Sequence, residues 1–120
     1  MSNFIESVSA RIEVNDIKNA LPLYQRLTGV AEVSVLDFPG LRLAVVGPFL
    51  LIEGDGPETL KTFHREATLH VNDLTGAVES FVAEGGEVLD GPVEAAGGRR
   101  TIVRDRDGNV FECFQPGKPQ

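Results

Sequence analysis

An internal duplication constrains the fold of this chain more than any other feature. The tripeptide Val14-Asn15-Asp16 returns 57 positions later as Val71-Asn72-Asp73. The same spacing relates three further pairs, which are Ala20 and Ala77, Tyr24 and Phe81, and Gly29 and Gly86. With 120 residues the chain has the length of one compact domain. The repeat therefore predicts two copies of one structural unit within a single fold.

Each half follows the same order of strand, helix and three further strands. An Asn-Asp pair that can cap a helix ends the first strand of each half, and a glycine that can end a helix follows the apolar helical spacing. In the first half we expect strands at 8–14, 31–37, 41–46 and 49–53, with a helix from residue 17 to Gly29. In the second half we expect strands at 66–71, 87–93, 99–105 and 109–115, with a helix at 74–84.

Pro22 complicates the first helix, because an interior proline removes a hydrogen bond and clashes with the preceding turn. Either Asn19 caps the helix and Pro22 lies in its first turn, or the helix is kinked. The predicted fold class is α+β, with two tandem βαβββ modules in one domain, 1–120. Module 1 covers 1–53, a connector covers 54–65, module 2 covers 66–115, and a tail covers 116–120.

Charge and cysteine usage narrow the classes of partner. The formal net charge of −7 repels nucleic acid and anionic lipid. No apolar run has the roughly twenty residues of a membrane helix, and the first residues do not have the pattern of a signal peptide. Cys113, the single cysteine, cannot form an internal disulfide. We therefore expect a cytoplasmic protein that binds neither nucleic acid nor membrane.

Two segments carry a resemblance to a known family. They are the Asp-x-Asp-Gly-Asn-x-x-Glu motif at 105–112 and the helix pattern at 20–29. Together with the two modules, these segments resemble the vicinal oxygen chelate superfamily, which includes glyoxalase I, bleomycin-resistance proteins and extradiol dioxygenases. The resemblance covers nearly the whole chain. It implies that the modules form an open, partly closed β-barrel whose inner face is a ligand cleft.

The resemblance also implies where a metal would bind. Enzymes of the family usually hold a divalent metal with His, Glu, His and Glu from the first, fourth, fifth and eighth strands. Ser9 and Glu66 occupy the two histidine positions here, and Glu112 matches the last position. The fourth-strand position is Leu51 or Glu53. We therefore expect no cofactor, and a hard cation held by Glu53, Glu66 and Glu112 is the alternative.

Strand alternation predicts the side chains that face the cleft. The expected set is Ser9, Arg11, Glu13, Glu53, Glu66, Thr68, His70, Val110, Glu112 and Phe114. Four carboxylates in this set favour a cationic or amphipathic small molecule, unless the cleft is open and each carboxylate is solvated. If the protein is an enzyme, His70 or Glu13 is the candidate catalytic base, although a strand histidine is commonly structural.

Residues outside this set are assigned simpler roles. We expect His64 to be a solvated surface residue of the connector and Cys113 to pack with Phe111 against a helix. Alternation points either Arg99 or Arg100 into the cleft, where it could bind a ligand anion.

The leading hypothesis for function is a small-molecule-binding protein of the bleomycin-resistance type. The alternatives are a metal-dependent lyase, isomerase or dioxygenase of the glyoxalase family, and a protein-binding domain with a vestigial cleft. The resemblance further implies a homodimer in which each cleft combines module 1 of one chain with module 2 of the other.

Overall fold

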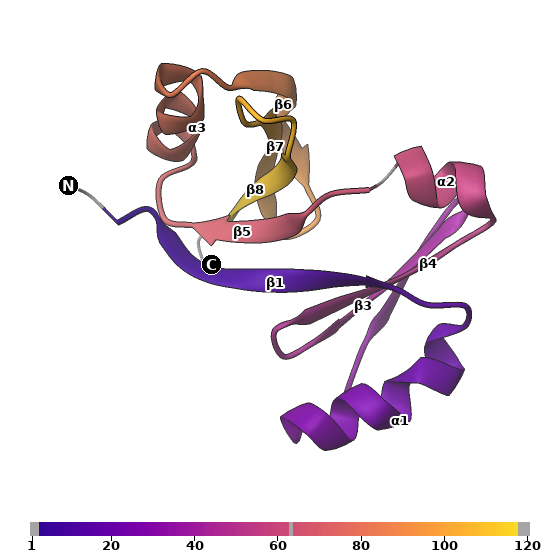
Figure 1. Cartoon of the computed structure of the whole chain (residues 1–120). Coiled ribbons are helices and arrows are strands. Elements are labelled where there is room, and N and C mark those ends of the chain that lie inside the picture. The colour runs from indigo at the N-terminus through magenta and orange to yellow at the C-terminus, as the bar shows by residue number, and fades with distance from the viewer. Residues whose placement is uncertain (1–2, 63, 118–120) are drawn as a thin grey trace. The chain divides into compact units, whose positions relative to one another are not determined.

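The fold is taken from a computed structural model, which describes residues 3–62 and 64–117 (Figure 1). The chain divides into two compact units. The N-terminal module is Ser9–His64, and the C-terminal module is Arg65–Gln120 together with Met1–Val8. Strand β1 (Ile5–Glu13) begins in the C-terminal module and ends in the N-terminal module.

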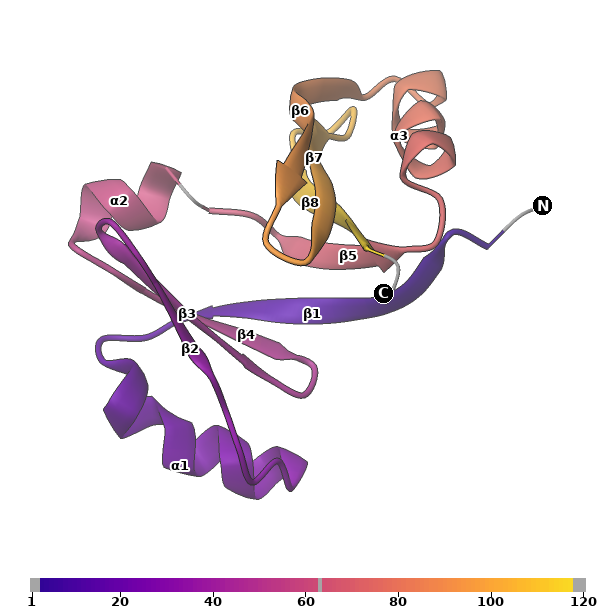
Figure 2. The ribbon, with the colours of Figure 1, turned by 180° about the vertical axis from the view of Figure 1, so that it is seen from behind.

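The N-terminal module contains a βαβββ unit and one additional short helix. After β1 come α1 (Ile17–Thr28), β2 (Val35–Phe38), β3 (Leu41–Val46), β4 (Phe49–Gly54) and α2 (Pro57–Thr62). The strands lie in the order β2-β3-β4-β1, with β1 and β4 parallel and the other neighbours antiparallel. Figure 2 shows α1 on one side of these strands.

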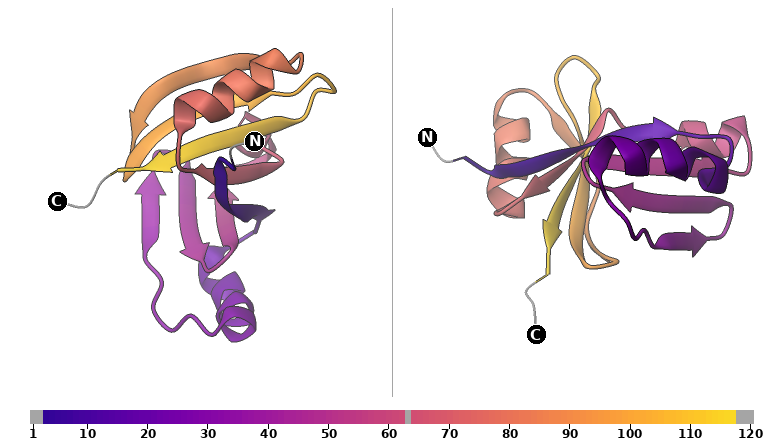
Figure 3. Two further views of the ribbon diagram at one scale, coloured as in Figure 1. Left: turned by 90° about the vertical axis from the view of Figure 1, so that its left-hand side faces the viewer. Right: turned by 90° about the horizontal axis from the view of Figure 1, so that it is seen from below.

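The C-terminal module repeats this arrangement. It contains β5 (Ala67–Val71), α3 (Leu74–Ala83), β6 (Glu87–Ala95), β7 (Gly98–Arg104) and β8 (Val110–Pro116). The strand order is β5-β8-β7-β6, and the parallel pair is β5 with β8. In Figure 3, left, α3 lies across one face of this sheet. The predicted α+β class and the two βαβββ modules are confirmed.

The two long helices begin at the predicted aspartates. The Asp16 carboxylate accepts a hydrogen bond from the Lys18 amide at 2.9 Å, and Asp73 accepts from the Gly76 amide at 3.1 Å. Helix α1 ends at Gly29, whose φ of 75° suits glycine. Because Asp16 is the N-cap, the alternative with Asn19 as the cap is wrong. Pro22 lies in the interior of α1.

In each module, the start of the long helix is also held by a side chain from the strand that pairs with the module's first strand. Glu53, near the end of β4, accepts a hydrogen bond from the Ile17 amide at 2.9 Å. Gln115, near the end of β8, accepts one from the Leu74 amide at 2.8 Å. Both bonds satisfy an amide in the first turn, where a helix has no internal acceptor to offer. Glu53 and Gln115 are therefore equivalent positions of the repeat.

Each helix packs on its own sheet through a separate apolar core. The core of the N-terminal module contains Ile17, Ala44, Val46 and Leu51, with Ile12, Val14 and Phe49 packed against it. The core of the C-terminal module contains Leu69, Val71, Leu74, Ala77, Val103 and Cys113, with Phe111 packed against it. The predicted packing of Cys113 with Phe111 on the helix side is confirmed. Burial raises the pKa of the Cys113 thiol to about 11, and Glu112 adds to the effect.

The main differences from the expected elements lie at the margins of the modules. The segment 54–65, expected to be a connector, contains α2 and belongs mostly to the N-terminal module. Pro57 fits the first turn of a helix because its φ is already helical and it has no amide to satisfy. The first strand starts three residues earlier than expected, and the next strand starts only at Val35. None of the described helices is long and apolar enough to cross a lipid bilayer.

Candidate functional site

The sheet of the C-terminal module has one face toward α3 and one face away from it. Leu69, Val71 and Cys113 belong to the core beneath α3. Successive strand residues point to opposite sides, so the residues between them lie on the other face. Thr68, His70, Glu112 and Phe114 therefore lie together on the face away from α3.

Strand register extends this face across all four strands of the module. Thr68 pairs with Glu112, Glu112 with Ile102, and Ile102 with Asp90. In the neighbouring row His70 pairs with Phe114, and Phe114 with Arg100. Paired residues point to the same side of a sheet. Polar and aromatic side chains on this surface form what we call the polar face. Its members are Arg65, Thr68, His70, Asp90, Arg100, Glu112 and Phe114.

Side-chain contacts organise the polar face. The Thr68 hydroxyl donates to Glu112 Oε1 at 3.0 Å. The rings of His70 and Phe114 meet edge to face, with centroids 6.1 Å apart. Arg100 Nη1 lies 3.2 Å from Asp90 Oδ2. The face thus combines an aromatic pair with carboxylates and a guanidinium that already have fixed orientations.

Arg65 brings a second guanidinium to the same surface. Burial lowers the pKa of Arg65 below its ordinary value, while Glu112 raises it, Arg100 lowers it and Asp90 raises it. The three latter groups act through space, so Arg65 lies near all of them. Arg65 and Asp90 were not predicted from the sequence, and strand alternation left the choice between Arg99 and Arg100 open. The strand register selects Arg100, because Arg100 pairs with Phe114 whereas Arg99 pairs with Gln115.

Two further members of the predicted set border this surface. Glu66 directly precedes β5, and its amide donates to the Val110 carbonyl at 2.7 Å. Glu66 is exposed and Val110 is half-buried. They mark the end of the sheet at which β5 and β8 begin.

In the N-terminal module, Ser9, Arg11 and Glu13 also lie on the face away from the helix. Ile12 and Val14 pack toward α1. The alternate residues of β1 consequently point to the opposite side. Ser9 is buried, while Arg11 is half-buried and Glu13 is exposed.

Glu53 departs from the prediction. It lies two residues after Leu51, which belongs to the core beneath α1, and its carboxylate accepts from the Ile17 amide. Glu53 thus lies on the helix side of β4, whereas we expected it to face the cleft. The strand register identifies a different counterpart of Glu112. Leu50 pairs with Arg11 as Glu112 pairs with Thr68, and Arg11 and Thr68 are equivalent in the repeat.

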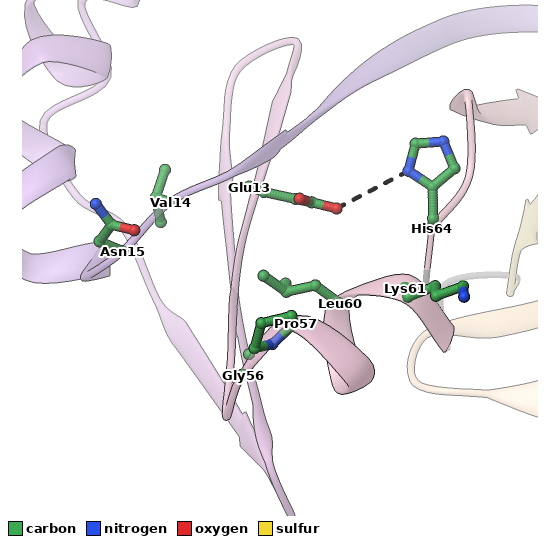
Figure 4. Close-up of a pocket in the computed structure, with 9 residues that line it drawn as sticks. Glu13, Val14, Asn15, Gly56, Pro57, Leu60, Lys61 and His64 are labelled. Atoms are coloured by element: carbon green, nitrogen blue, oxygen red, sulfur yellow. Dashed lines mark ion pairs between the residues drawn. The ribbon is translucent and has the colours of Figure 1, made fainter.

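Glu13 lines a pocket that lies entirely within the N-terminal module (Figure 4). The pocket has a volume of about 650 Å³. Glu13 Oε1 lies 3.8 Å from His64 Nδ1 across it. His64 was expected to be a solvated surface residue, and its side chain is 60% exposed, but it faces Glu13. The two candidate bases, Glu13 and His70, belong to different modules.

The turn between β7 and β8 carries the characteristic acidic motif. Asp105 accepts hydrogen bonds from the side chain and the amide of Asn109 and from the amide of Asp107, each at 2.9 Å. These bonds, those from Asn109 first, hold the pKa of Asp105 below its ordinary value. The motif therefore stabilises a turn, and its carboxylate is already engaged there.

The available donors decide which metals could be held. Within the described residues, neither module brings three His, Cys, Asp or Glu side chains together around one point. The four family positions correspond to Ser9, Leu50, Glu66 and Glu112, with neither histidine present. A serine, an apolar side chain and two carboxylates do not fit a transition metal that prefers imidazole.

Comparison with known proteins agrees with this fold. The family model described as Glyoxalase/Bleomycin resistance protein/Dioxygenase superfamily matches residues 7–113. The chain belongs to this superfamily. A search of curated proteins gave no match.

Solved structures with the same fold include an uncharacterised protein from Methanosarcina mazei. It is 30% identical, with a TM-score of 0.87, and the match covers 100% of this chain and 98% of that chain. Methylmalonyl-CoA epimerase from Mycobacterium tuberculosis is 16% identical, with a TM-score of 0.72 over 98% of this chain and 93% of that chain. At that identity the second likeness concerns the fold alone.

Proposed function

We propose that this protein binds a small organic molecule on the polar face, in the manner of the bleomycin-resistance members of its superfamily and without a transition metal. The observation that carries the proposal is the polar face itself. It places charged groups of both signs beside an aromatic pair on one side of one sheet. Binding sites for small molecules commonly combine a few fixed polar groups with apolar or aromatic surface.

The composition of the face supports one class of ligand. His70 and Phe114 offer a flat apolar surface, and Glu112 and Asp90 are opposed by Arg65 and Arg100. A cationic or amphipathic ligand was expected from the carboxylates, and the two guanidinium groups, which balance these carboxylates, favour the amphipathic class. An amphipathic molecule with an apolar ring and a charged or zwitterionic group fits this arrangement better.

The metal-dependent alternative has less support. It required Glu53, Glu66 and Glu112 as ligands, yet one Glu53 oxygen accepts from the Ile17 amide and holds the start of α1. Glu112 accepts from the Thr68 hydroxyl. A lyase, isomerase or dioxygenase that needs a metal as its Lewis acid would therefore have fewer carboxylate ligands with which to hold that metal.

The test is a thermal-shift screen with amphipathic aromatic acids, amines and amino acids, followed by calorimetry on each compound that raises the melting temperature. Arg100→Gln should weaken binding of such compounds. Arg99→Gln is the matched control, because Arg99 lies on the same strand and also has an acidic partner, Glu94, on the neighbouring strand. Equal affinity of both variants for every ligand found would refute the polar face as the site.

We also propose a homodimer. β2 is an end strand of its sheet and exposes apolar side chains at Val35, Leu36 and Phe38. Unpaired strand edges with exposed apolar residues favour association, and two-fold dimers are the commonest outcome. Light scattering at micromolar concentration should give twice the chain mass, and a mass near 12.9 kDa would refute the dimer.

A cytoplasmic location completes the proposal. Cys113 is the single cysteine and is buried, so the fold depends on no disulfide. That composition suits a reducing compartment. Immunodetection in cell fractions would test it, and recovery outside the cytoplasm would contradict it.

A further inference from the structure

We propose that the pocket of the N-terminal module is a second binding site, which takes a zwitterion of the α-amino acid class with an apolar side chain. This inference goes beyond the proposed function, because the residues that line the pocket belong to the N-terminal module, whereas the polar face belongs to the C-terminal module. The pocket volume of about 650 Å³ lies within the range of small-molecule sites.

The pocket is formed where a short helix packs against a strand end. Helix α2 contributes Pro57, Leu60 and Lys61, and the end of β4 contributes Gly54. A Cβ atom at Gly54 would lie 2.9 Å from the Leu60 side chain, so the absence of a side chain at Gly54 allows α2 to approach the strand this closely. Figure 4 shows Leu60 extending from α2 toward the end of β1.

The apolar part of the lining consists of Val14, Pro57 and Leu60. Val14 and Leu60 are themselves half-buried, so each is partly held by its neighbours. A hydrocarbon side chain that contacts this surface leaves water, which is favourable. Gly56 keeps the pocket open beside Pro57, because a Cβ atom at Gly56 would meet nothing within 4 Å. The lining therefore has room for an apolar group and a surface against which to place it.

The charged part of the lining carries one group of each sign. Glu13 and Lys61 both line the pocket. Across the described part of the chain, Glu13 faces His64, with 3.8 Å between Oε1 and Nδ1, and forms no ion pair with Lys61. With the imidazole neutral, as it is counted in the net charge of −7, the charges of Glu13 and Lys61 sum to zero. The pocket thus offers two opposite charges that are not paired with each other.

This balance of charges favours a zwitterion over an ion of either sign. A cation would be attracted by Glu13 and repelled by Lys61, and an anion would meet the reverse, so the two contributions oppose each other. A zwitterion can place its ammonium group near Glu13 and its carboxylate near Lys61, which makes both contributions favourable. An α-amino acid carries both groups on one carbon atom, and its side chain remains available for the apolar part of the lining.

Both charged side chains can reach such a ligand. The Glu13 side chain is 47% exposed, and the imidazole at 3.8 Å is beyond hydrogen-bond distance. A carboxylate has about four acceptor positions, so Glu13 can accept from a ligand ammonium group while His64 stays in place. Lys61 carries three donors on a flexible four-carbon stem, which lets its ammonium group adjust to a ligand carboxylate.

Four probes that share the leucine side chain and differ in charge test this inference. They are L-leucine, the cation leucinamide, the anion N-acetylleucine and the neutral N-acetylleucinamide. Each is titrated into the full-length protein at pH 7, and the amide resonances are followed by NMR. L-leucine should shift the resonances of Asn15, Leu60 and Lys61 saturably and should bind more tightly than the other three probes. Equal or tighter binding of any other probe, or the absence of saturable shifts with L-leucine, would overturn the proposal.

Removing one charge at a time provides the decisive control. Lys61→Met should weaken L-leucine binding about threefold and make leucinamide the preferred probe, whereas Glu13→Gln should make N-acetylleucine the preferred probe. Lys18→Met changes the net charge as Lys61→Met does, on the same module but outside the pocket lining, and should leave the order of affinities unchanged. Equal effects of the two lysine substitutions, or no change of preferred probe, would overturn the site. The proposed function is judged separately, because its ligands should perturb resonances of Thr68 and Glu112.

Discussion

Replacing Glu53 tests whether its carboxylate serves the helix and not a ligand. Its oxygen lies 2.9 Å from the Ile17 amide, one of the first-turn amides that the helix itself cannot pair. Glu53→Leu removes the acceptor and leaves that amide unpaired in a half-buried position. The expected loss of stability is about 1 to 3 kcal/mol. Glu53→Gln keeps an acceptor and removes the charge, which should cost only about 0.3 to 1 kcal/mol.

The repeat supplies the matched control. Gln115 performs the equivalent task for Leu74 with a neutral amide, so Gln115→Leu should cost about as much as Glu53→Leu. Gln115→Glu should be tolerated. The measurement is urea unfolding followed by circular dichroism, with the free energy obtained by linear extrapolation. If Glu53→Leu is neutral, or if Glu53→Gln is equally damaging, the helix-holding role of this side chain is refuted.

Three further predictions concern reactivity, acid stability and metal affinity. Because burial raises the pKa of Cys113 to about 11, a disulfide reagent at pH 8 should leave the native thiol unmodified and label it only in urea. Hydrogen bonds, those from Asn109 foremost, lower the pKa of Asp105 in the folded protein. The contribution of Asp105 to folding stability is therefore present above the ordinary carboxyl pKa of about 3.9 and is lost as the pH falls. Asp105→Asn should flatten the acid side of the stability profile, and an unchanged profile would contradict this. Ser9→His together with Leu50→Glu restores two family ligand positions and should raise nickel or zinc affinity in calorimetry. Unchanged affinity would mean that these positions do not converge.

Much of the fold could be predicted from the sequence because the same pattern of strand, helix cap and helix occurs in both halves of the chain. The aspartates at 16 and 73 and the glycine at 29 are local signals, and each works through its own backbone bonds. The orientation of β5 and β8 followed from alternation alone, because both strands have one apolar face beneath α3. The same alternation puts Thr68, His70, Glu112 and Phe114 together on the other face.

The errors arose where a residue's role depends on pairing across strands. Glu53 was assigned to the cleft from the spacing of a motif, but its orientation depends on the register of β4 with β1, which no local signal carries. Arg65 was assigned to a connector, and Asp90 was not considered, because the surface that they share is created by strands far apart in the sequence. Helix α2 was missed because six residues give too short a periodic pattern.

Metal content tests the central claim most directly. The protein should be purified from cells grown with added manganese, iron, nickel and zinc, without chelators or a metal-binding tag, and analysed by mass spectrometry of its metals. Ser9 and Leu50 offer no imidazole or carboxylate, and Glu53 is engaged at α1, so the account predicts no stoichiometric transition metal. One equivalent of manganese, iron, nickel or zinc per chain, lost when Glu112 is replaced by Gln, would contradict it.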